Sequence, residues 1–146
     1  MVVGKHPTGE LSDSGIEGCA AGENFKCNDI VRFTHLLTGK NLHSHLFRSP
    51  LSGQQEVSAF GENGIGDNSD DWKIVCGGGK DLAIDVPFHL MHVATGKYLT
   101  SNADARFNNQ NCPNCPILGQ LEVVAVKSVR QAGLWVIQRG VFIHQE

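Results

Sequence analysis

The sequence is short of charged residues and has no long hydrophobic run. Charged side chains make up 18% of its 146 residues, against 40% hydrophobic ones and 17 glycines. This composition is typical of a turn-rich domain rather than of long amphipathic helices or a disordered tail. Twelve Lys and Arg against fifteen Asp and Glu leave a net charge of -3, so the basic surface that nucleic-acid binding requires is missing. The longest apolar runs, 123–126 and 134–137, are strand-sized and far below the roughly 20 residues that cross a bilayer. We therefore expect one domain with no nucleic-acid partner and no membrane span.

The first residues also lack the apolar segment of a secretory signal peptide. Residues 1–24 are rich in Gly, Ser, Asp and Glu without an apolar period, and this composition predicts a flexible leader. The chain nevertheless contains five cysteines, more than is usual for a small cytosolic domain. That number favours an oxidising compartment and leaves one thiol over.

From residue 30 onward, short apolar runs alternate with turn residues, which is the pattern of an all-β domain. The same order of apolar runs and turn residues occurs twice along the chain, which indicates an internal duplication. The matching anchors are Thr38-Gly39-Lys40 with Thr95-Gly96-Lys97, Gly53-Gln54 with Gly119-Gln120, Glu56-Val57 with Glu122-Val123, and Trp72 with Trp135. The expected strands are 30–33, 41–43, 56–60 and 72–75 in the first copy, and 88–92, 97–99, 122–126 and 135–137 in the second. We define unit 1 as residues 25–76 and unit 2 as residues 82–143, with an insertion at 108–116 in unit 2.

A unit of four short strands cannot bury its own apolar face, so the units are expected to close an antiparallel barrel together. The architecture that fits best is a β-trefoil, which needs three units. Only two are visible, so a third either precedes residue 1 in the natural protein or comes from a partner. The expected core consists of apolar residues at matching positions: Phe33, Leu42, Val57, Trp72, Leu90, Leu99, Val123 and Trp135.

One stretch is specific enough to suggest a family. It contains Val31-Arg32-Phe33, Thr38-Gly39-Lys40, His43-Ser44-His45, Gln55-Glu56-Val57 and Trp72 in this order. The stretch closely resembles an MIR repeat and is similar to the middle repeat of the stromal cell-derived factor 2 family, including its -like member. Gly119-Gln120, and Trp135 followed by Gly140-Val141-Phe142, resemble the last repeat of that family. The resemblance covers about residues 17–143.

The resemblance implies an MIR-type β-trefoil of the endoplasmic reticulum lumen, or a secreted one, without enzymatic activity. It also implies binding to a J-domain co-chaperone and the lumenal chaperone network, with unfolded clients or glycans as further candidate ligands. The alternative is a carbohydrate-binding β-trefoil module, because MIR repeats also occur in protein O-mannosyltransferases. The first repeat, signal peptide and retention signal of the family are not seen in this sequence.

Two histidines, His43 and His45, follow a predicted strand and share one of its faces, because side chains alternate along a strand. This is the spacing of a chelating pair, but a metal needs a third ligand. His35 or Glu56 could approach, yet unit 2 has no ligand pair at the equivalent 100–102. We interpret the pair as a hydrogen-bonded corner or a partner-facing group, and expect no bound metal or other cofactor.

Gln54, Gln55 and Glu56 could present amide and carboxylate groups to sugar hydroxyls. Alternatively, they cap backbone groups in a repeated turn, and the recurrence of Gln120 and Glu122 in unit 2 favours this structural interpretation. One carboxylate in each unit is not a glycosidase pair. Together with His43 and His45, these residues form the candidate binding surface, and no residue is predicted to be catalytic.

Cys27 and Cys76 bracket unit 1, just before its first strand and just after its last. These ends lie near each other in a closed repeat, so a structural disulfide between them is the preferred pairing. Cys112 and Cys115 have the spacing of a redox or zinc pair. They lack the strand-to-helix context and the second close cysteine pair that those sites need, which leaves a local loop staple or free thiols.

The acidic stretch Asp67–Asp71 resembles a calcium loop in composition only. It lacks the central glycine and the distant glutamate of an EF-hand. We therefore predict a solvated hairpin loop there.

Overall fold

The alternating apolar runs form short antiparallel strands in the computed structural model, which describes residues 2–5, 24–77, 81–83 and 85–137. The strands are β1 Val2–Lys5, β2 Ile30–His35, β3 Lys40–Arg48, β4 Gln55–Phe60, β5 Trp72–Val75, β6 His89–His92, β7 Lys97–Arg106 and β8 Leu121–Val126. Among the described residues, helix is limited to two short 3-10 turns, η1 Asn68–Asp70 and η2 Gln131–Gly133. None of these elements is long and apolar enough to span a membrane as a helix. The expected all-β class is confirmed.

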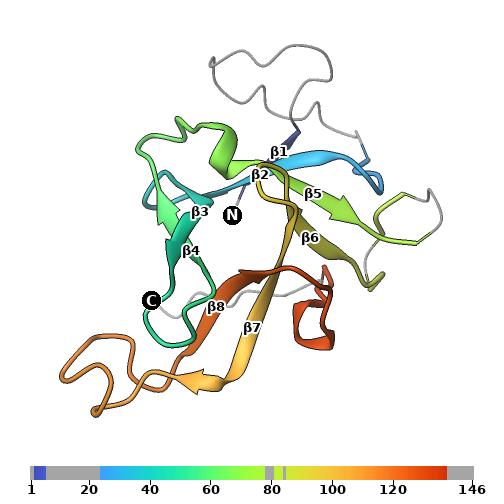
Figure 1. Ribbon diagram of the computed structural model, residues 1–146. Helices are drawn as coiled ribbons and strands as arrows, with labels where there is room; N and C mark the ends of the chain where they lie inside the picture. The colour runs from blue at the N-terminus through green and yellow to red at the C-terminus, as the bar shows by residue number, and fades with distance from the viewer. Residues whose placement is uncertain (1, 6–23, 78–80, 84, 138–146) are drawn as a thin grey trace, which may run out of the picture.

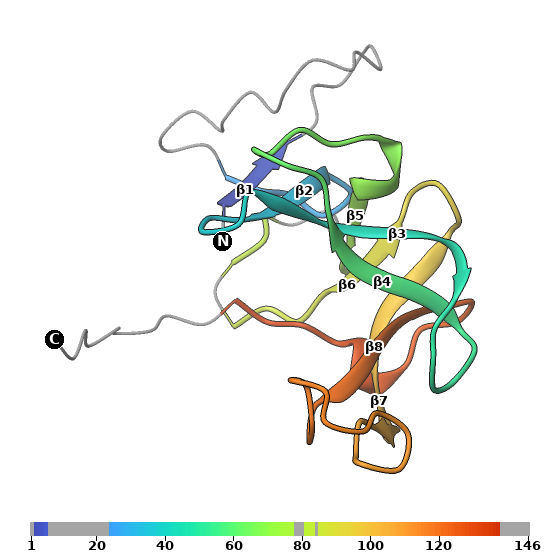
Figure 2. The same cartoon turned by 90° about the vertical axis from the view of Figure 1, so that its left-hand side faces the viewer.

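The strands from β2 to β8 close into a barrel. Their order around the ring is β2-β3-β4-β8-β7-β6-β5, and β5 pairs back onto β2, as the ring in Figure 1 shows. β1 lies beside β2 as an additional strand. Unit 1 and unit 2 are joined twice, because β4 pairs with β8 and β5 pairs with β6. Figure 2 shows the β3–β4 hairpin running alongside β8.

The strand register of unit 1 recurs in unit 2. The equivalent pairs are Thr34 with Asn41 and Met91 with Tyr98 in the first hairpin, Leu42 with Ala59 and Leu99 with Ala125 in the second, and Val31 with Trp72 and Phe88 with Trp135 at the closure of each unit. The two 3-10 turns also occupy equivalent positions, each ending two residues before a tryptophan. The anchors that match in sequence therefore lie at matching places in the fold.

The pairing of β1 with β2 is equivalent to the pairing of β5 with β6. It pairs Val3 with Phe33 on β2, and β5 pairs Ile74 with Leu90 on β6. Phe33 and Leu90 occupy equivalent positions in their units. β1 therefore takes, beside unit 1, the place that the last strand of unit 1 takes beside unit 2.

Two expectations differ from the structure. Residues 135–137 were expected to form a strand, but Trp135 makes only an isolated bridge to Phe88. β5, its counterpart, is held on both sides by β2 and β6, and 135–137 has no second neighbour among the described residues. Residues 2–5 lie in the expected flexible leader, yet they form β1 because β2 offers a free edge. The rest of that leader, 6–23, and the end of unit 2, 138–143, lie outside the described residues.

The core contains apolar side chains from both units. The buried cluster is Val31, Trp72, Ile74, Phe88, Leu90 and Leu99, and Phe33, Leu42, Val57, Val123 and Trp135 are partly buried against it. All the residues expected in the core thus lie in this cluster or against it. Trp72 is fully buried, and its indole Nε1–H donates to the Leu42 carbonyl at 3.0 Å, so its polar atom is satisfied inside the barrel.

Two disulfides join cysteines of the described residues. Cys27 and Cys76, with Cα atoms 5.4 Å apart, connect the start of unit 1 to its end. Cys112 and Cys115 close a short loop between β7 and β8, drawn in orange at the lower left of Figure 1. Cys19 lies outside the described residues.

Candidate functional site

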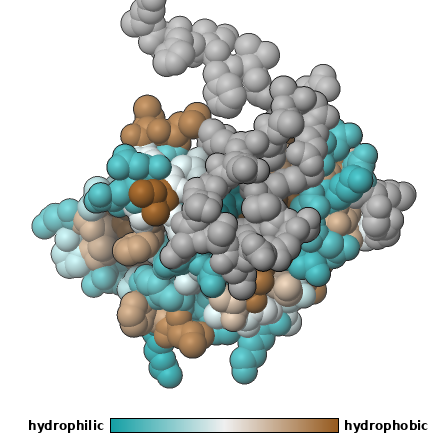
Figure 3. Space-filling view, turned by 90° about the horizontal axis from the view of Figure 1, so that it is seen from above, coloured by the Kyte–Doolittle hydropathy of each residue, from teal (hydrophilic) through white to brown (hydrophobic). Residues whose placement is uncertain are grey.

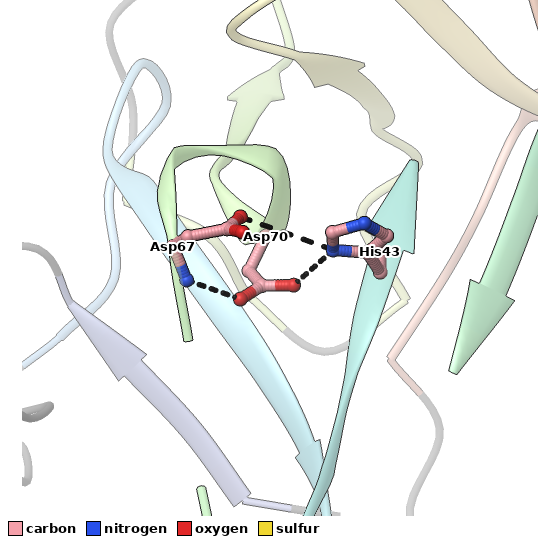
Figure 4. Close-up of side chains that lie close together, drawn as sticks. All are labelled: His43, Asp67 and Asp70. Atoms are coloured by element: carbon pink, nitrogen blue, oxygen red, sulfur yellow. Dashed lines mark hydrogen bonds and ion pairs between the residues drawn. The ribbon is translucent and has the colours of Figure 1, made fainter. Parts of the chain in front are cut away.

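A buried carboxylate organises the surroundings of the two histidines. Asp70 is 2% exposed. Its Oδ1 accepts a hydrogen bond from His43 Nδ1 at 2.8 Å, and its Oδ2 accepts from the Asp67 backbone N–H at 2.7 Å and from Asn41 Nδ2 at 3.4 Å. Figure 4 shows Asp67 and Asp70 converging on His43. Each carboxylate oxygen is thus used inside the protein, as a buried charge requires.

The local sequence explains how Asp70 reaches this position. Asp67 caps η1 by accepting from the Ser69 N–H at 2.7 Å, and Asp70 completes a capping box by binding the Asp67 N–H. Gly66 allows the approach, because a Cβ at this residue would collide with Asp70 Oδ2. Asp71, next in the chain, is buried against the Arg32 guanidinium at 2.6 Å.

The prediction of a solvated hairpin loop at Asp67–Asp71 is therefore wrong for its last two residues, whereas Asp67 and Asn68 are exposed as expected. Asp70 and Asp71 are 2% and 4% exposed, because each has a partner that compensates for the loss of water. Burial alone would lower the pKa of Arg32, but the hydrogen bond to Asp71 and the negative charges of Asp71, Asp70 and Asp67 together outweigh burial, and the pKa of Arg32 is raised. Asp70 and Asp71 thus form internal contacts of the barrel, whereas Asp67 lies at the surface.

The hydrogen bonds continue from Asp70 through both histidines. Since Nδ1–H of His43 donates to Asp70, the other ring nitrogen of neutral His43 accepts from His45 Nδ1, 2.9 Å away. His45 Nε2 lies 3.5 Å from Glu56 Oε1, at ion-pair distance but without a hydrogen bond. These successive polar contacts lead from the interior of unit 1 to its surface, in the order Asp70, His43, His45 and Glu56.

The same histidines belong to a row of four rings. Side-chain alternation on β3, together with the β3–β4 register, puts Phe47, His45, His43 and Phe60 on one face. Consecutive ring centroids are 4.2 Å, 4.9 Å and 4.9 Å apart. We call these four side chains the ring row. Its ends are exposed, with Phe47 at 66% and Phe60 at 58%, whereas His43 is buried.

Unit 2 has no equivalent of the ring row. Thr100, Asn102 and Val126 occupy the positions equivalent to His43, His45 and Phe60, and Gly133 occupies the position of Asp70. Unit 2 nevertheless forms the same hairpins in the same register. The fold therefore does not require the ring row, which makes these residues candidates for function.

The predicted glutamines do not join this surface. Gln54 is exposed at a turn. Gln55 is 3% exposed, and its amide donates to Ser44 Oγ at 2.8 Å and to Thr95 Oγ1 at 3.0 Å, so it links the two units from inside. Of the five predicted surface residues, the structure brings together His43, His45 and Glu56 and separates Gln54 and Gln55 from them.

Sequence reasoning missed four residues of this site: Asn41, Asp70, Phe47 and Phe60. The spacing of Asp67 and Asp70 is that of a capping box, which could have indicated a helical turn rather than a loop. The two phenylalanines lie at the strand ends in places where alternation could have assigned them to the histidine face. The contact between Asp70 and His43 has no local signal, because it joins residues 27 positions apart.

His43, Asp67 and Asp70 could offer ligand atoms to a metal ion, since these atoms lie within 4.8 Å of one another. Their existing hydrogen bonds, however, already use the atoms that an ion would need. The geometry is that of a satisfied polar corner, and we assign no ion to it.

A second buried carboxylate connects the two units. Glu122 is 3% exposed and accepts from the backbone N–H groups of Leu51 at 2.8 Å and Ser52 at 3.1 Å. Burial alone would raise the pKa of Glu122, but the hydrogen bonds from Ser52, Leu51 and Ser49 together outweigh it and the pKa is lowered. The turn of unit 1 at 49–53 is thus held by a charge from unit 2. We call this contact the Glu122 contact.

Among the described residues, the most exposed apolar side chains lie in unit 1. Besides Phe47 and Phe60, the most exposed are Leu36, Leu37, Leu46 and Ile65, each at 66% or more. Seen from above, brown hydrophobic groups are scattered at the surface among teal hydrophilic ones (Figure 3). The described part of unit 2 has exposed apolar side chains as well, but none of them exceeds 52% exposure.

The family model described as MIR domain matches residues 15–81. Stromal cell-derived factor 2-like protein 1 of Mus musculus is 41% identical over 126 residues, covering 86% of this chain and 53% of the mouse protein. The chain thus spans about half the length of the curated relatives it matches.

Two solved structures are also similar. The crystal structure of the SDF2-like protein from Arabidopsis thaliana matches with a TM-score of 0.76 and 31% identity, over 97% of this chain and 70% of that one. The protein O-mannosyltransferase Pmt1-Pmt2 complex of S. cerevisiae, bound to the sugar donor, matches with a TM-score of 0.65 and 31% identity. That match covers 80% of this chain and 17% of the yeast chain.

Proposed function

The chain belongs to the stromal cell-derived factor 2 family of MIR-domain proteins, and from this we propose that it is a non-enzymatic adaptor of the endoplasmic reticulum lumen. In this proposal it binds a J-domain co-chaperone and assists protein folding and quality control. The family membership supports the compartment and the partner. The ring row supports recognition as the activity.

The fold that accompanies this function is a β-trefoil of MIR type in which a third unit completes the two described here. The repeated strand register supports this, because unit 1 and unit 2 are interchangeable in their pairing. The position of β1 supports it too, because β1 relates to unit 1 as β5 relates to unit 2.

The observation that carries the function is the ring row. A chemical site needs a reactive group that is free to meet a substrate, but the buried groups Asp70, His43 and Gln55 are hydrogen-bonded to the protein itself. What unit 1 leaves at the surface is aromatic, with Phe47 and Phe60 mostly exposed. Exposed aromatic side chains beside half-buried polar groups are typical of surfaces that bind other proteins.

The two disulfides support a lumenal location. Such bonds persist in the oxidising secretory pathway and are rare in the reducing cytosol, and the chain contains one that closes a long loop and one that closes a short loop.

The test uses the purified chain and a purified lumenal J-domain co-chaperone. We expect binding by calorimetry for the unmodified chain, a loss of roughly tenfold or more in affinity for the double variant Phe47→Ala/Phe60→Ala, and no change for the control Leu118→Ala. Leu118 is an exposed apolar residue of unit 2. Absence of binding by the unmodified chain, or equal binding by all three proteins, would count against the proposal.

A second candidate function is carbohydrate binding. The similarity to a protein O-mannosyltransferase favours it. The exposed rings of Phe47 and Phe60 contact two histidines that lie 3.5 Å and 3.9 Å from the carboxylates of Glu56 and Asp67. Such a group has the chemistry of a sugar-binding surface, since a ring face packs on a sugar and carboxylates accept from hydroxyls. A glycan array decides between the two. Binding of a defined glycan that Phe60→Ala abolishes would favour this candidate, and an array without signal would exclude it.

A further inference from the structure

The connection between β7 and β8 contains an insertion that the barrel does not need. Its base is closed by two backbone hydrogen bonds of Phe107, with Gln120 at 2.9 Å and with Gly119 at 2.8 Å. Ser49 makes the two equivalent bonds at the base of the shorter connection between β3 and β4. The insertion at 108–116 therefore extends a turn that both units share, and it lies in the orange loop of Figure 1.

The insertion is held in shape by asparagine side chains. Asn108 Oδ1 accepts from the backbone N–H groups of Gln110 at 2.8 Å and Asn111 at 3.1 Å. The Asn111 side chain accepts from the Asn108 N–H and donates to the Arg106 carbonyl, each at 2.9 Å. The Cys112 N–H donates to the Asn108 carbonyl at 2.8 Å. None of these bonds uses a sulfur atom, so the loop keeps its internal support when the disulfide in it is reduced.

A tight turn brings the two cysteines of the insertion together. The Cys115 N–H donates to the Cys112 carbonyl at 3.3 Å, and Asn114 between them has a φ of 56°. Proline followed by a residue with positive φ is typical of a type II turn, and Pro113 precedes Asn114. The Cα atoms of the cysteines are 5.6 Å apart. Because the backbone turn sets this spacing, the pair can open and close without rebuilding the loop.

The two disulfides of the described residues differ in their access to other molecules. Cys27 is 8% exposed, and Cys76 packs against the core. Cys112 and Cys115 are half-buried among neighbours that are mostly exposed. Exchange of a disulfide requires that a thiolate reaches one of its sulfur atoms. The pair in the insertion is therefore the more accessible of the two, and the buried pair is an internal reference.

The charge around the insertion suits the approach of a thiolate. Arg106 is the only charged residue between positions 105 and 121, and its guanidinium donates to the Gly119 carbonyl at the base of the loop. The stretch has no carboxylate that would repel an anionic sulfur. Leu118, which follows the insertion closely, is 43% exposed and offers an apolar contact to an unfolded chain.

We propose that the Cys112–Cys115 disulfide is a thiol–disulfide exchange site that oxidises thiols, either cysteines of an unfolded polypeptide or a small thiol such as glutathione. A thiolate forms a bond to one sulfur of the pair, the bond between Cys112 and Cys115 breaks, and the released sulfur takes up a proton. A second thiolate then displaces the remaining sulfur from the mixed disulfide, and that sulfur is protonated in turn. Two electrons pass to the pair, which becomes two thiols, and the two substrate thiols become a disulfide.

This inference goes beyond the adaptor function and does not need the co-chaperone. The loop lacks the helix N-terminus that activates the cysteines of redox enzymes, so the pair is a stoichiometric acceptor in this proposal rather than a turnover catalyst. Failure of the exchange leaves co-chaperone binding untested, and the two failures are therefore distinguishable.

The test incubates the purified chain, without oxygen, with an unfolded synthetic peptide that carries two cysteine thiols or, in a second arm, with reduced glutathione. Free thiols are alkylated at timed intervals and mapped by mass spectrometry. We expect Cys112 and Cys115 to be reduced roughly a hundredfold or more faster than Cys27 and Cys76, with one peptide disulfide formed for each pair reduced. The variant Cys112→Ser/Cys115→Ser is the control and should leave the peptide reduced.

The arms of this experiment also distinguish the source of the thiol. Faster reaction with the peptide assigns the site to polypeptide cysteines, and faster reaction with glutathione assigns it to a small thiol. Reduction of Cys112 and Cys115 no faster than that of Cys27 and Cys76 overturns the proposal in either arm. Equal peptide oxidation by the control variant and the unmodified chain overturns it too. The comparison within the unmodified chain holds even if the variant does not fold.

A second measurement separates an exchange site from a structural staple. Hydrogen exchange is followed at residues 107–120 before and after selective reduction of the pair, and oxidised glutathione is then added. We expect unchanged exchange at the Cys112 and Gly119 N–H groups, and recovery of the disulfide. Loss of protection at these groups on reduction would show that the disulfide holds the loop together, and would overturn the proposal.

Discussion

Asp70 and His43 lie at places where unit 2 has two smaller residues. Where unit 1 has this carboxylate and imidazole, unit 2 has Gly133 and Thr100, and a Cβ on Gly133 would lie 2.5 Å from the Leu99 carbonyl oxygen. Unit 2 avoids this collision because residue 133 is a glycine and has no side chain. Unit 1 instead keeps a buried charge, which is stable because several donors surround it.

The stability of unit 1 should therefore depend on Asp70. Asp70→Ala leaves the His43 ring N–H and the Asp67 backbone N–H without their acceptor, and each buried unsatisfied donor costs about 1–3 kcal/mol. We expect a loss of about 3 kcal/mol in the free energy of unfolding, measured by urea denaturation. Asp104→Ala, at an exposed residue, is the control and should change stability by less than about 0.5 kcal/mol. Equal stability of the two variants would contradict the role of Asp70.

His92 should make stability depend on pH. Burial lowers the pKa of His92 below the ordinary value of 6.5, and the hydrogen bond of its Nε2–H to the Ser69 carbonyl at 3.0 Å only partly opposes this shift. In the neutral ring, Nδ1 accepts from Thr95 Oγ1 at 2.8 Å. Below pH 6.5 the imidazole of His92 binds a proton in the unfolded chain but stays neutral in the folded chain. Stability should therefore fall as the pH decreases from 6.5.

Urea denaturation at several pH values checks this. His92→Gln should flatten the slope between pH 6.5 and about pH 5, whereas His35→Gln, at an exposed residue, should keep it. A slope that is identical in His92→Gln and the unmodified chain would show that another group is responsible.

At the scale of elements, the most predictable strands were those whose sequence pattern occurs in both units. Residues 56–60 and 122–126 were expected as strands and lie in β4 and β8. β3 was expected at 41–43 but continues to Arg48, because it pairs with β4 at Ser44 and, after a register shift, at Arg48, a contact that sequence patterns do not reveal. The error at Asp67–Asp71 has the same origin, since acidic residues indicate solvent unless a distant partner such as Arg32 is known.

The site was predictable to a similar degree. Alternation was enough to put His43 and His45 on one face, and the structure adds their hydrogen bond. Gln54 and Gln55 are neighbours in sequence but point to different environments. Assigning Gln55 to the surface was wrong, because it is the first residue of β4 and its amide is hydrogen-bonded inside the barrel, whereas Gln54 precedes the strand and is exposed.

The two disulfides should contribute unequally to stability. Cys27 and Cys76 are separated by 49 positions, and Cys112 and Cys115 by 3. A cross-link limits the unfolded chain more when the loop is longer, which gives about 4 kcal/mol for the first disulfide and about 2 kcal/mol or less for the second. The paired variants Cys27→Ser/Cys76→Ser and Cys112→Ser/Cys115→Ser test this by urea denaturation. If the second pair cost as much as the first, loop length would not be the cause.

At the scale of the whole molecule, the two units share one core and cannot be separated without exposing it. Of the buried cluster, Val31, Trp72 and Ile74 come from unit 1, and Phe88, Leu90 and Leu99 come from unit 2. β5 of unit 1 also pairs along its length with β6 of unit 2. Neither unit alone has the other half of these contacts.

We therefore expect the chain to unfold in a single transition and the isolated units to remain unfolded. Tryptophan fluorescence and far-ultraviolet circular dichroism should give coincident midpoints in urea, because Trp72 lies in the shared core. Polypeptides of residues 25–77 and 82–137 should each lack a cooperative transition, since a single repeat leaves its apolar face in water. A cooperative transition in either fragment would mean that one unit holds a sufficient core by itself. In that case the strand pairs between units, β4 with β8 and β5 with β6, would align two preformed parts rather than build one barrel.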